Sequence, residues 1–220
     1  MTETTHQVHS PVGGSSNRCD RLGPVAPLPR NLVRVPSVKQ RTDFSCGAAA
    51  TLSLLRYWRW NVYARVDETA LYVPLKTTRS NGTEPEPIAA FLSIAGEIPA
   101  EYAHTSVTVA DLEQAVDSRE PPIVDLQAWI DDDMPWRDVW DAGHYVIMVG
   151  YDDERVFFMD PSTMTPGGCA YLPRREFHER WHDLAGDPYV RLEHMAIFAH
   201  GSTPVWVPNE PAPERAAKLG

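Results

Sequence analysis

The sequence predicts an α+β fold in which an N-terminal helical half packs against a C-terminal antiparallel β-sheet. Residues 46–118 contain segments whose apolar side chains follow a helical spacing, whereas residues 121–200 contain runs of β-branched and aromatic residues bounded by turn residues. Helices followed by strands along the chain are typical of α+β domains, in which the two kinds of element are segregated.

The first half of the chain contains one extended piece, at 32–38, and several candidate helices. A helix is expected from Cys46 to about Trp58, because its leucines and tryptophans are spaced to share one face. Further helices are expected at 67–76, 84–96 and 108–118, the last with Thr108 as its N-cap.

The second half is rich in strand patterns. Strands are expected at 121–129, 144–152, 155–160 and 193–200. Asp152 and Asp153 stand between two of these runs, which indicates a hairpin. A late helix of about a dozen residues is expected within 171–184.

Composition and charge narrow the domain organisation and the class of protein. The 220 residues are 43% hydrophobic, which is enough for one domain with a sizeable core, placed at 31–202. Residues 1–30 are expected to form a disordered N-terminal tail and residues 203–220 a flexible C-terminal tail. The formal net charge of −10 argues against nucleic-acid binding. No segment is apolar for long enough to span a membrane, and no signal peptide is expected.

The three cysteines, Cys19, Cys46 and Cys169, are an odd number at wide spacing. They indicate reduced thiols and a cytoplasmic location rather than a disulfide framework. Cys46 stands where the first helix should begin, and a helix N-terminus stabilises a thiolate. Gly47 is expected to let a substrate carbonyl approach the backbone. Gln40, six residues upstream, is a candidate donor to an oxyanion beside the Cys46 N–H.

His144 is the candidate base for this nucleophile, since it begins a predicted strand directly after Gly143, which is itself expected to contact the substrate. Asp160 ends the next predicted strand, 16 residues later, and a hairpin would bring it beside His144. Its carboxylate would then orient the imidazole, as the third member of a triad does. Taken one by one, these residues have ordinary structural interpretations as buried filler, surface residue and turn former. Together they favour thiol catalysis without a metal or another cofactor.

The segments 40–50 and 143–162 resemble the papain-like cysteine peptidases that remove double-glycine leaders from bacteriocins, and more closely their stand-alone bacterial relatives. The resemblance extends over roughly residues 34–200. It implies a papain-like fold, a peptide or protein substrate, and roles for Gln40 as oxyanion donor, Cys46 as nucleophile, His144 as base and Asp160 as its orienter. The usual Cys-Gly-Pro of that family is Cys-Gly-Ala here.

Two other functions remain open on the same fold. One is a thiol-dependent acyl transferase or amidase, because a triad determines acyl chemistry but not the acceptor. The other is a catalytically silent module that binds peptides.

A zinc site is a more distant alternative. His178 and His182 belong to an H-E-x-x-H pattern, which on one helix would bind zinc, with Glu179 as base. The longer form of this motif requires a glycine and a third histidine, at positions where Ala185 and Pro188 stand. The pattern is therefore interpreted as part of an amphipathic helix, and no metal is predicted.

Residues 128–144 combine aspartates with tryptophans between two predicted strands. The plain interpretation is a solvated loop held by its aromatic side chains. The functional interpretation is a wall or lid beside His144, in which Trp136 and Trp140 contact the substrate.

Overall fold

The computed structural model of the chain describes residues 24–104, 106–130, 134–163, 165–186, 188–209 and 212–220. An eight-stranded sheet runs through the molecule in the order β1-β10-β6-β5-β4-β3-β9-β2, and β7 pairs with β8 in a separate two-stranded sheet. The strands are β1 (Val25–Pro27), β2 (Ala100–Ala103), β3 (Ile123–Gln127), β4 (Gly143–Tyr151), β5 (Arg155–Met159), β6 (Cys169–Pro173), β7 (His182–Ala185), β8 (Val190–Glu193), β9 (Ala196–Ala199) and β10 (Arg215–Lys218).

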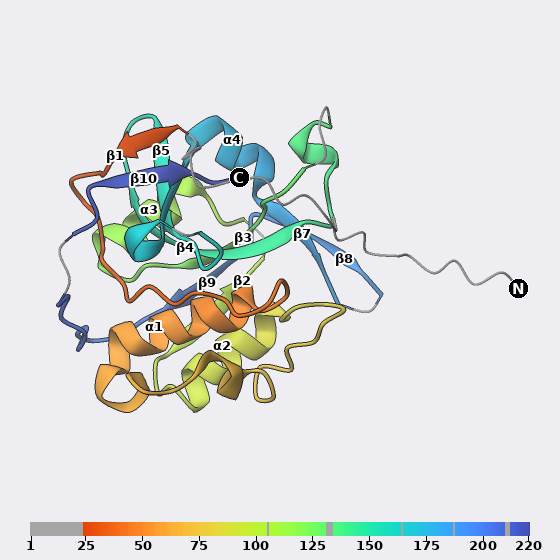
Figure 1. Ribbon diagram of the computed structural model, residues 1–220. Helices are drawn as coiled ribbons and strands as arrows, with labels where there is room; N and C mark the ends of the chain where they lie inside the picture. Colours follow the sequence, from red (N-terminus) through yellow and green to blue (C-terminus); the bar gives the residue numbers. More distant parts are fainter. Residues whose placement is uncertain (1–23, 105, 131–133, 164, 187, 210–211) are drawn as a thin grey trace, which may run out of the picture.

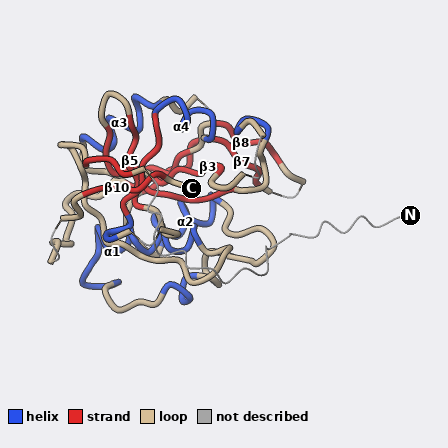
Figure 2. The backbone as a smooth tube through the Cα atoms, turned by 45° about the horizontal axis from the view of Figure 1, so that its top comes forward, coloured by secondary structure: helices blue, strands red, loops and turns tan. Residues whose placement is uncertain are grey.

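Helices cover both faces of the large sheet. Helices α1 and α2 lie on one side of it, and α3 and α4 lie on the other (Figures 1 and 2). The helices are α1 (Cys46–Tyr63), α2 (Pro85–Ile94), α3 (Val109–Asp117) and α4 (Arg174–Arg180), with short 3-10 helices η1 (Glu68–Leu71), η2 (Trp136–Asp138) and η3 (Pro166–Gly168). None of the helices in the described ranges is both long and apolar enough to cross a bilayer.

The core is built around α1 and β4. The first turns of α1 carry small residues, and Ala48, Ala49 and Ala50 have no exposed surface. Small side chains let the helix axis approach the sheet closely, so its first residues lie near the start of β4. A side chain larger than alanine at these positions would overpack a filled interior.

The α+β prediction is confirmed, and so are most of the expected elements. The hairpin at Asp152 connects β4 to β5, whose register pairs Met148 with Phe158. Thr108 caps α3 through a reciprocal capping box with Asp111. The sheet departs from the antiparallel expectation at one place, because β10 pairs with β6 in parallel.

Two expectations about helices were wrong. The helix expected at 67–76 is only the short η1, after which the chain turns. The late helix is also shorter than expected: residues 169–173 belong to β6, and α4 ends at Arg180. Trp181 leaves the helical conformation there, and its indole N–H donates to the Met195 carbonyl at 2.8 Å. Because the indole is buried in this position, the helix ends at Arg180 and the chain continues as β7 from His182.

The structure also differs from the flexible tail expected at 203–220. Residues 215–218 form β10, which lies between β1 and β6. Arg180 on α4 donates a hydrogen bond to the carbonyl of Gly220 at 2.8 Å. Most of the N-terminal tail expected at 1–30 lies outside the described residues, but Val25–Pro27 within it forms β1, which pairs with β10.

Candidate active site

Cys46 is the first residue of α1, and Ser45 is its N-cap. The preceding turn is closed by Ser45, whose hydroxyl accepts a hydrogen bond from the Thr42 N–H at 3.1 Å. Cys46 is a free thiol that is 8% exposed. The sulfur therefore lies at the positive end of the α1 dipole, where a negative charge is stabilised.

His144 and Asp160 form a buried ion pair across the β4–β5 hairpin. The distance from His144 Nε2 to Asp160 Oδ1 is 2.7 Å, and both side chains are almost completely buried. The same carboxylate oxygen accepts hydrogen bonds from the backbone N–H of Ser162 at 2.7 Å and from its hydroxyl at 2.8 Å. A carboxylate with three such donors is fixed in position, and so it orients the imidazole.

The electrostatics of this pair favour a charged imidazole. Burial lowers the pKa of His144, but the hydrogen bond and charge of Asp160, together with those of Cys46, raise it to about 10. Burial works in the opposite sense on Asp160, yet its interactions with His144 and Ser162 hold the pKa of Asp160 below its ordinary value. The effect of Cys46 on His144 means that the structure brings the sulfur, the imidazole and the carboxylate together.

The second ring nitrogen of His144 completes this arrangement. Its Nδ1 is buried and has no hydrogen-bond partner among the described residues. Since Nε2 is taken by Asp160, Nδ1 is the atom available to exchange a proton with Cys46. Catalytic hydrogen bonds of this kind are often long before substrate binds.

Gln40 lies next to the triad through its backbone. Its N–H donates to the carbonyl of Pro161, the residue after Asp160, at 3.0 Å. The side-chain amide Nε2 donates to the Thr42 carbonyl at 2.8 Å, while the amide oxygen Oε1 is buried without a partner in the described residues. An amide nitrogen carries two hydrogens, so one N–H of Gln40 remains for a second acceptor.

The two predicted site glycines have packing roles in this structure. A Cβ on Gly47 would lie 2.8 Å from Thr83 Cβ and 3.1 Å from Tyr145 Cδ2. A Cβ on Gly143 would lie 2.1 Å from Asp183 Oδ2. At both glycines, other protein atoms occupy the position of a Cβ. The sequence analysis had expected the substrate to approach there.

Trp136 and Trp140 contact cationic and imidazole groups on α4, β7 and β8. The Arg180 guanidinium lies 3.5 Å from the Trp136 ring centroid. Trp140 lies against His182 and Arg191, with centroid separations of 4.3 and 4.6 Å. The tryptophan against the imidazole of His144 is Trp129, which is 47% exposed and whose ring centroid lies 4.9 Å from that of His144.

The sequence reasoning missed several residues of the site. Trp129 was assigned to the end of the strand predicted at 121–129 and to the 128–144 loop, but not to the site, although its place at a strand end was a usable signal. Ser162 follows Asp-Pro, a pattern in which a hydroxyl commonly bonds back to the carboxylate two residues earlier. Asp125 and Asp183 both act electrostatically on this region, and of these Asp125 interrupts an otherwise apolar strand.

The H-E-x-x-H pattern does not lie on one helix. His178 belongs to α4, whereas His182 begins β7 and its Nε2 lies 2.7 Å from the Val139 carbonyl. The helical premise of the zinc alternative was therefore wrong. Across the described ranges, no three His, Cys, Asp or Glu side chains are grouped so that they would hold a metal ion.

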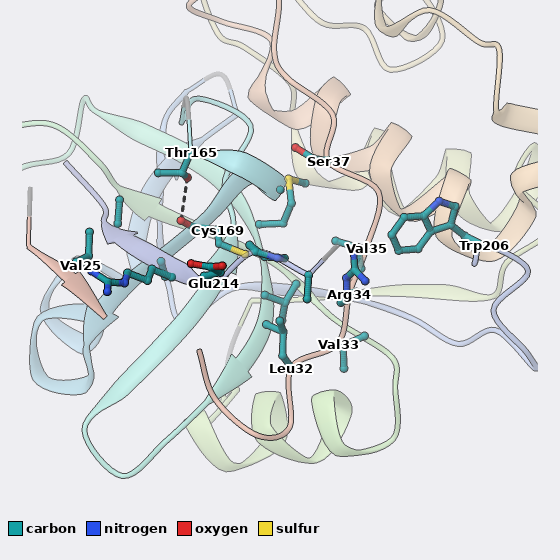
Figure 3. Close-up of a pocket in the computed structure, with 18 residues that line it drawn as sticks. Val25, Leu32, Val33, Arg34, Val35, Ser37, Thr165, Cys169, Trp206 and Glu214 are labelled. Atoms are coloured by element: carbon teal, nitrogen blue, oxygen red, sulfur yellow. Dashed lines mark hydrogen bonds between the residues drawn. The ribbon is translucent and has the colours of Figure 1, made fainter. Parts of the chain in front are cut away.

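A pocket of about 710 Å³ is lined by residues of the segment at 32–37 on one side and by Trp206 and residues 212–217 on the other (Figure 3). Neither Cys46 nor His144 lines it. Cys169 does, and burial raises the pKa of that thiol to about 11. A thiol of this kind is unreactive at neutral pH, so Cys169 is the structural cysteine and a natural control for Cys46.

Three solved structures with similar folds are peptidases by their descriptions. A putative C39-like peptidase from Bacillus anthracis is 18% identical, with a TM-score of 0.58 over 81% of this chain and 99% of that one. The peptidase domain of the Streptococcus transporter ComA is 18% identical, with a TM-score of 0.52 over 77% and 99%. A double glycine motif protease from an AMS/PCAT transporter, in complex with the leader peptide, is 16% identical, with a TM-score of 0.50 over 79% and 97%.

These likenesses confirm the papain-like α+β fold that the sequence resemblance implied. Among curated proteins, no sequence is significantly similar to this chain. The model of the Peptidase_C39 like family matches residues 32–188, which include Cys46, His144 and Asp160. This chain therefore belongs to the Peptidase_C39 like family.

Proposed function

We propose that this protein is a cysteine peptidase that hydrolyses a peptide bond in a peptide or protein substrate. The observation that carries the proposal is the 2.7 Å contact between His144 and Asp160 next to a cysteine at a helix N-terminus. Asp160 keeps the imidazole charged and oriented, and an imidazolium beside a cysteine favours the thiolate, which is the nucleophile.

In the proposed reaction, the Cys46 thiolate attacks the scissile carbonyl carbon. The backbone N–H of Cys46 and the free amide N–H of Gln40 stabilise the oxyanion. His144 then gives its proton to the leaving amine, which departs as the C–N bond breaks. Water, deprotonated by His144, attacks the remaining thioester, and the acid product leaves as the thiol–imidazole pair is restored.

The family and the fold support the proposed substrate class. One protease of similar fold was solved in complex with a leader peptide, which supports an extended peptide as the substrate. We include removal of a leader peptide in the proposal, as the first reaction to test. We assign the reaction to a reducing compartment, because Cys46 and Cys169 are both free thiols.

A peptide library followed by mass spectrometry tests the proposal. The wild-type protein and its Cys169→Ala variant should cleave the same peptides, and Cys46→Ala should cleave none. Iodoacetamide should abolish cleavage and a metal chelator should leave it unchanged. Cleavage that survives Cys46→Ala, or that only the chelator stops, would overturn the proposal. Alkylation of Cys46 with no peptide cleaved would also count against a peptidase and favour acyl transfer or peptide binding.

A further inference from the structure

Asp125 is a buried carboxyl group in the middle of a sheet strand. It lies on β3, where its Cα pairs with that of Tyr145 on β4, and the residue is 3% exposed. Its Oδ1 is buried and accepts no hydrogen bond from the described residues. A buried acceptor without a donor costs about 1–3 kcal/mol. Such an oxygen is favoured by any donor that can reach it.

Asp183 on β7 stands beside Asp125. Gln127 Nε2, also on β3, donates to Asp183 Oδ1 at 2.9 Å, and the open side of Gly143 faces the same carboxylate. Burial and then the charge of Asp183 raise the pKa of Asp125 well above its ordinary value. The pKa of Asp183 is also raised, mainly by burial. Two carboxyl groups this close share one proton when no cation is present.

The carboxyl pair adjoins the nucleophile. After burial and Asp183, the charge of Cys46 is the next influence on Asp125. Tyr145, which the open side of Gly47 faces, has its pKa raised by burial and then by Asp125, Asp183 and Cys46. Asp125, Asp183 and Cys46 therefore all act on Tyr145, whose ring packs against Gly47 in the first turn of α1.

The positive groups that act on this region are imidazoles: His144 lies beside Cys46, and the charge of His182 lowers the pKa of Asp183. The Arg and Lys ion pairs of the described residues engage other carboxylates. Glu84, the N-cap of α2, adds a further negative charge close to Tyr145 and accepts a hydrogen bond from the Gly186 N–H at 2.9 Å. A guanidinium or ammonium group would bring several N–H donors and a permanent positive charge to the two carboxyl groups.

We propose that Asp125 and Asp183 form a subsite beside Cys46 that binds a positively charged side chain, Lys or Arg, next to the scissile bond of the substrate. This inference rests on the proposed peptidase function. It adds a substrate preference that the triad itself does not set. Binding of the cation displaces the shared proton to solvent, and the ion pairs then form in a site shielded from water, where they discriminate strongly against a neutral side chain.

Charged thiol reagents test the subsite without requiring peptide cleavage. The rate of Cys46 modification is measured with 2-aminoethyl methanethiosulfonate, which is cationic, and with methyl methanethiosulfonate, which is neutral. The protein carries Cys169→Ala, so that Cys169 cannot react. The rate of each reagent with Cys46 is divided by the rate of the same reagent with N-acetylcysteine, which corrects for the reagent's intrinsic reactivity. The cationic reagent should be favoured about 10-fold or more, as expected for a focused field of opposite sign. Asp125→Asn combined with Asp183→Asn should remove this preference, and Glu97→Gln, on an exposed and separate ion pair, should retain it.

Equal corrected rates in the wild-type protein would overturn the inference, whether or not the variants fold. A preference that survives both Asp→Asn substitutions in protein of unchanged melting temperature would overturn it as well. If the double variant unfolds, Asp183→Asn alone is used, since Asp183 is only half-buried.

Peptide kinetics supply the second measurement. Once a cleaved peptide is known, versions with Lys and with norleucine at each position flanking the scissile bond are compared. At one position Lys should raise kcat/KM about 10-fold, and the double variant should lose that gain while still cleaving the norleucine peptide. Cleavage without any preference for Lys would overturn the subsite and leave the peptidase intact. Absence of cleavage with a clear preference for the cationic reagent would overturn the peptidase and leave the cation site.

Discussion

His144 Nε2 and Asp160 Oδ1 lie 2.7 Å apart, and 1% and 4% of their side chains are exposed. A charged hydrogen bond that water does not reach is stronger than one on the surface, and breaking it leaves an unpaired buried charge. The pair joins the first residues of β4 to the loop after β5. The pair therefore determines the protonation state of His144 and also stabilises the packing of the β4–β5 hairpin.

Asp160→Asn should lower kcat/KM by about 10²- to 10⁴-fold, the range that a positioned acid or base contributes. The amide keeps the shape of the side chain but removes the negative charge that keeps His144 protonated. The measurement is peptide cleavage at pH 7, with circular dichroism to confirm folding. Asp152→Asn, at the turn of the same hairpin, serves as the control and should stay within a few fold of wild type. Full activity in Asp160→Asn would exclude Asp160 as the orienting residue.

Raising the pH should weaken both catalysis and stability through His144. The folded-state pKa of about 10 lies above the ordinary value of 6.5. Protonation of His144 therefore favours the folded state: the gain is fully present below pH 6.5 and is lost as the pH rises through 10. The free energy of unfolding, measured in urea at several pH values, should fall across this window, and the alkaline limb of kcat/KM should lie well above pH 8. In Asp160→Asn, the free energy of unfolding should vary less with pH across this window, and the alkaline limb of kcat/KM should move to lower pH.

Gln40→Ala should lower kcat about 10²- to 10³-fold, as loss of one oxyanion donor does. KM should change little, because this hydrogen bond strengthens only in the transition state. Gln114→Ala, on the exposed face of α3, removes the same amide elsewhere and should change neither constant. A fall in melting temperature with unchanged kcat would assign Gln40 to the Thr42 turn rather than to catalysis.

The sequence predicts a contact of the site when the two residues belong to one helix start or one hairpin, and it does not when they come from distant segments. Cys46 at a helix start and His144 opposite Asp160 could be predicted, because each follows from a helix signal or one hairpin. Asp183 joins the same region through β7, a strand that the helical pattern of 171–184 concealed. The pairing of β10 was equally hidden, since residues 215–218 carry little strand pattern of their own and are ordered by β1 and β6.

The tryptophans illustrate the same limit within a loop. Trp129, Trp136 and Trp140 are equivalent by composition, and no periodicity within a loop says which one faces His144. The structure distinguishes them through tertiary contacts: the ring of Trp129 lies against the imidazole, and that of Trp136 lies under Arg180.

Trp129→Ala should lower kcat/KM about 10-fold, because it admits water to the His144–Asp160 pair and weakens their interaction. Its pH profile should also shift, with the alkaline limb moving to lower pH. Trp136→Ala is the matched variant: it loses a cation–π contact with Arg180, worth about 0.5–2 kcal/mol of stability, and should keep the wild-type pH profile. A larger catalytic loss in Trp136→Ala than in Trp129→Ala would restore the lid role predicted for Trp136.

Gly143→Ala should destabilise the protein by about 1–3 kcal/mol, the usual cost of overpacking. The new methyl group would lie 2.1 Å from Asp183 Oδ2 and 2.6 Å from its Cγ, so the carboxylate must move. Asp183→Ala removes those atoms, and the double variant should recover much of the loss caused by Gly143→Ala. Urea unfolding of the four proteins gives the coupling energy directly, since the two residues are in contact. Gly220→Ala, where nothing lies within 4 Å of the new Cβ, should leave stability unchanged. Additive effects of Gly143→Ala and Asp183→Ala would show that the glycine is required for another reason than the approach of this carboxylate.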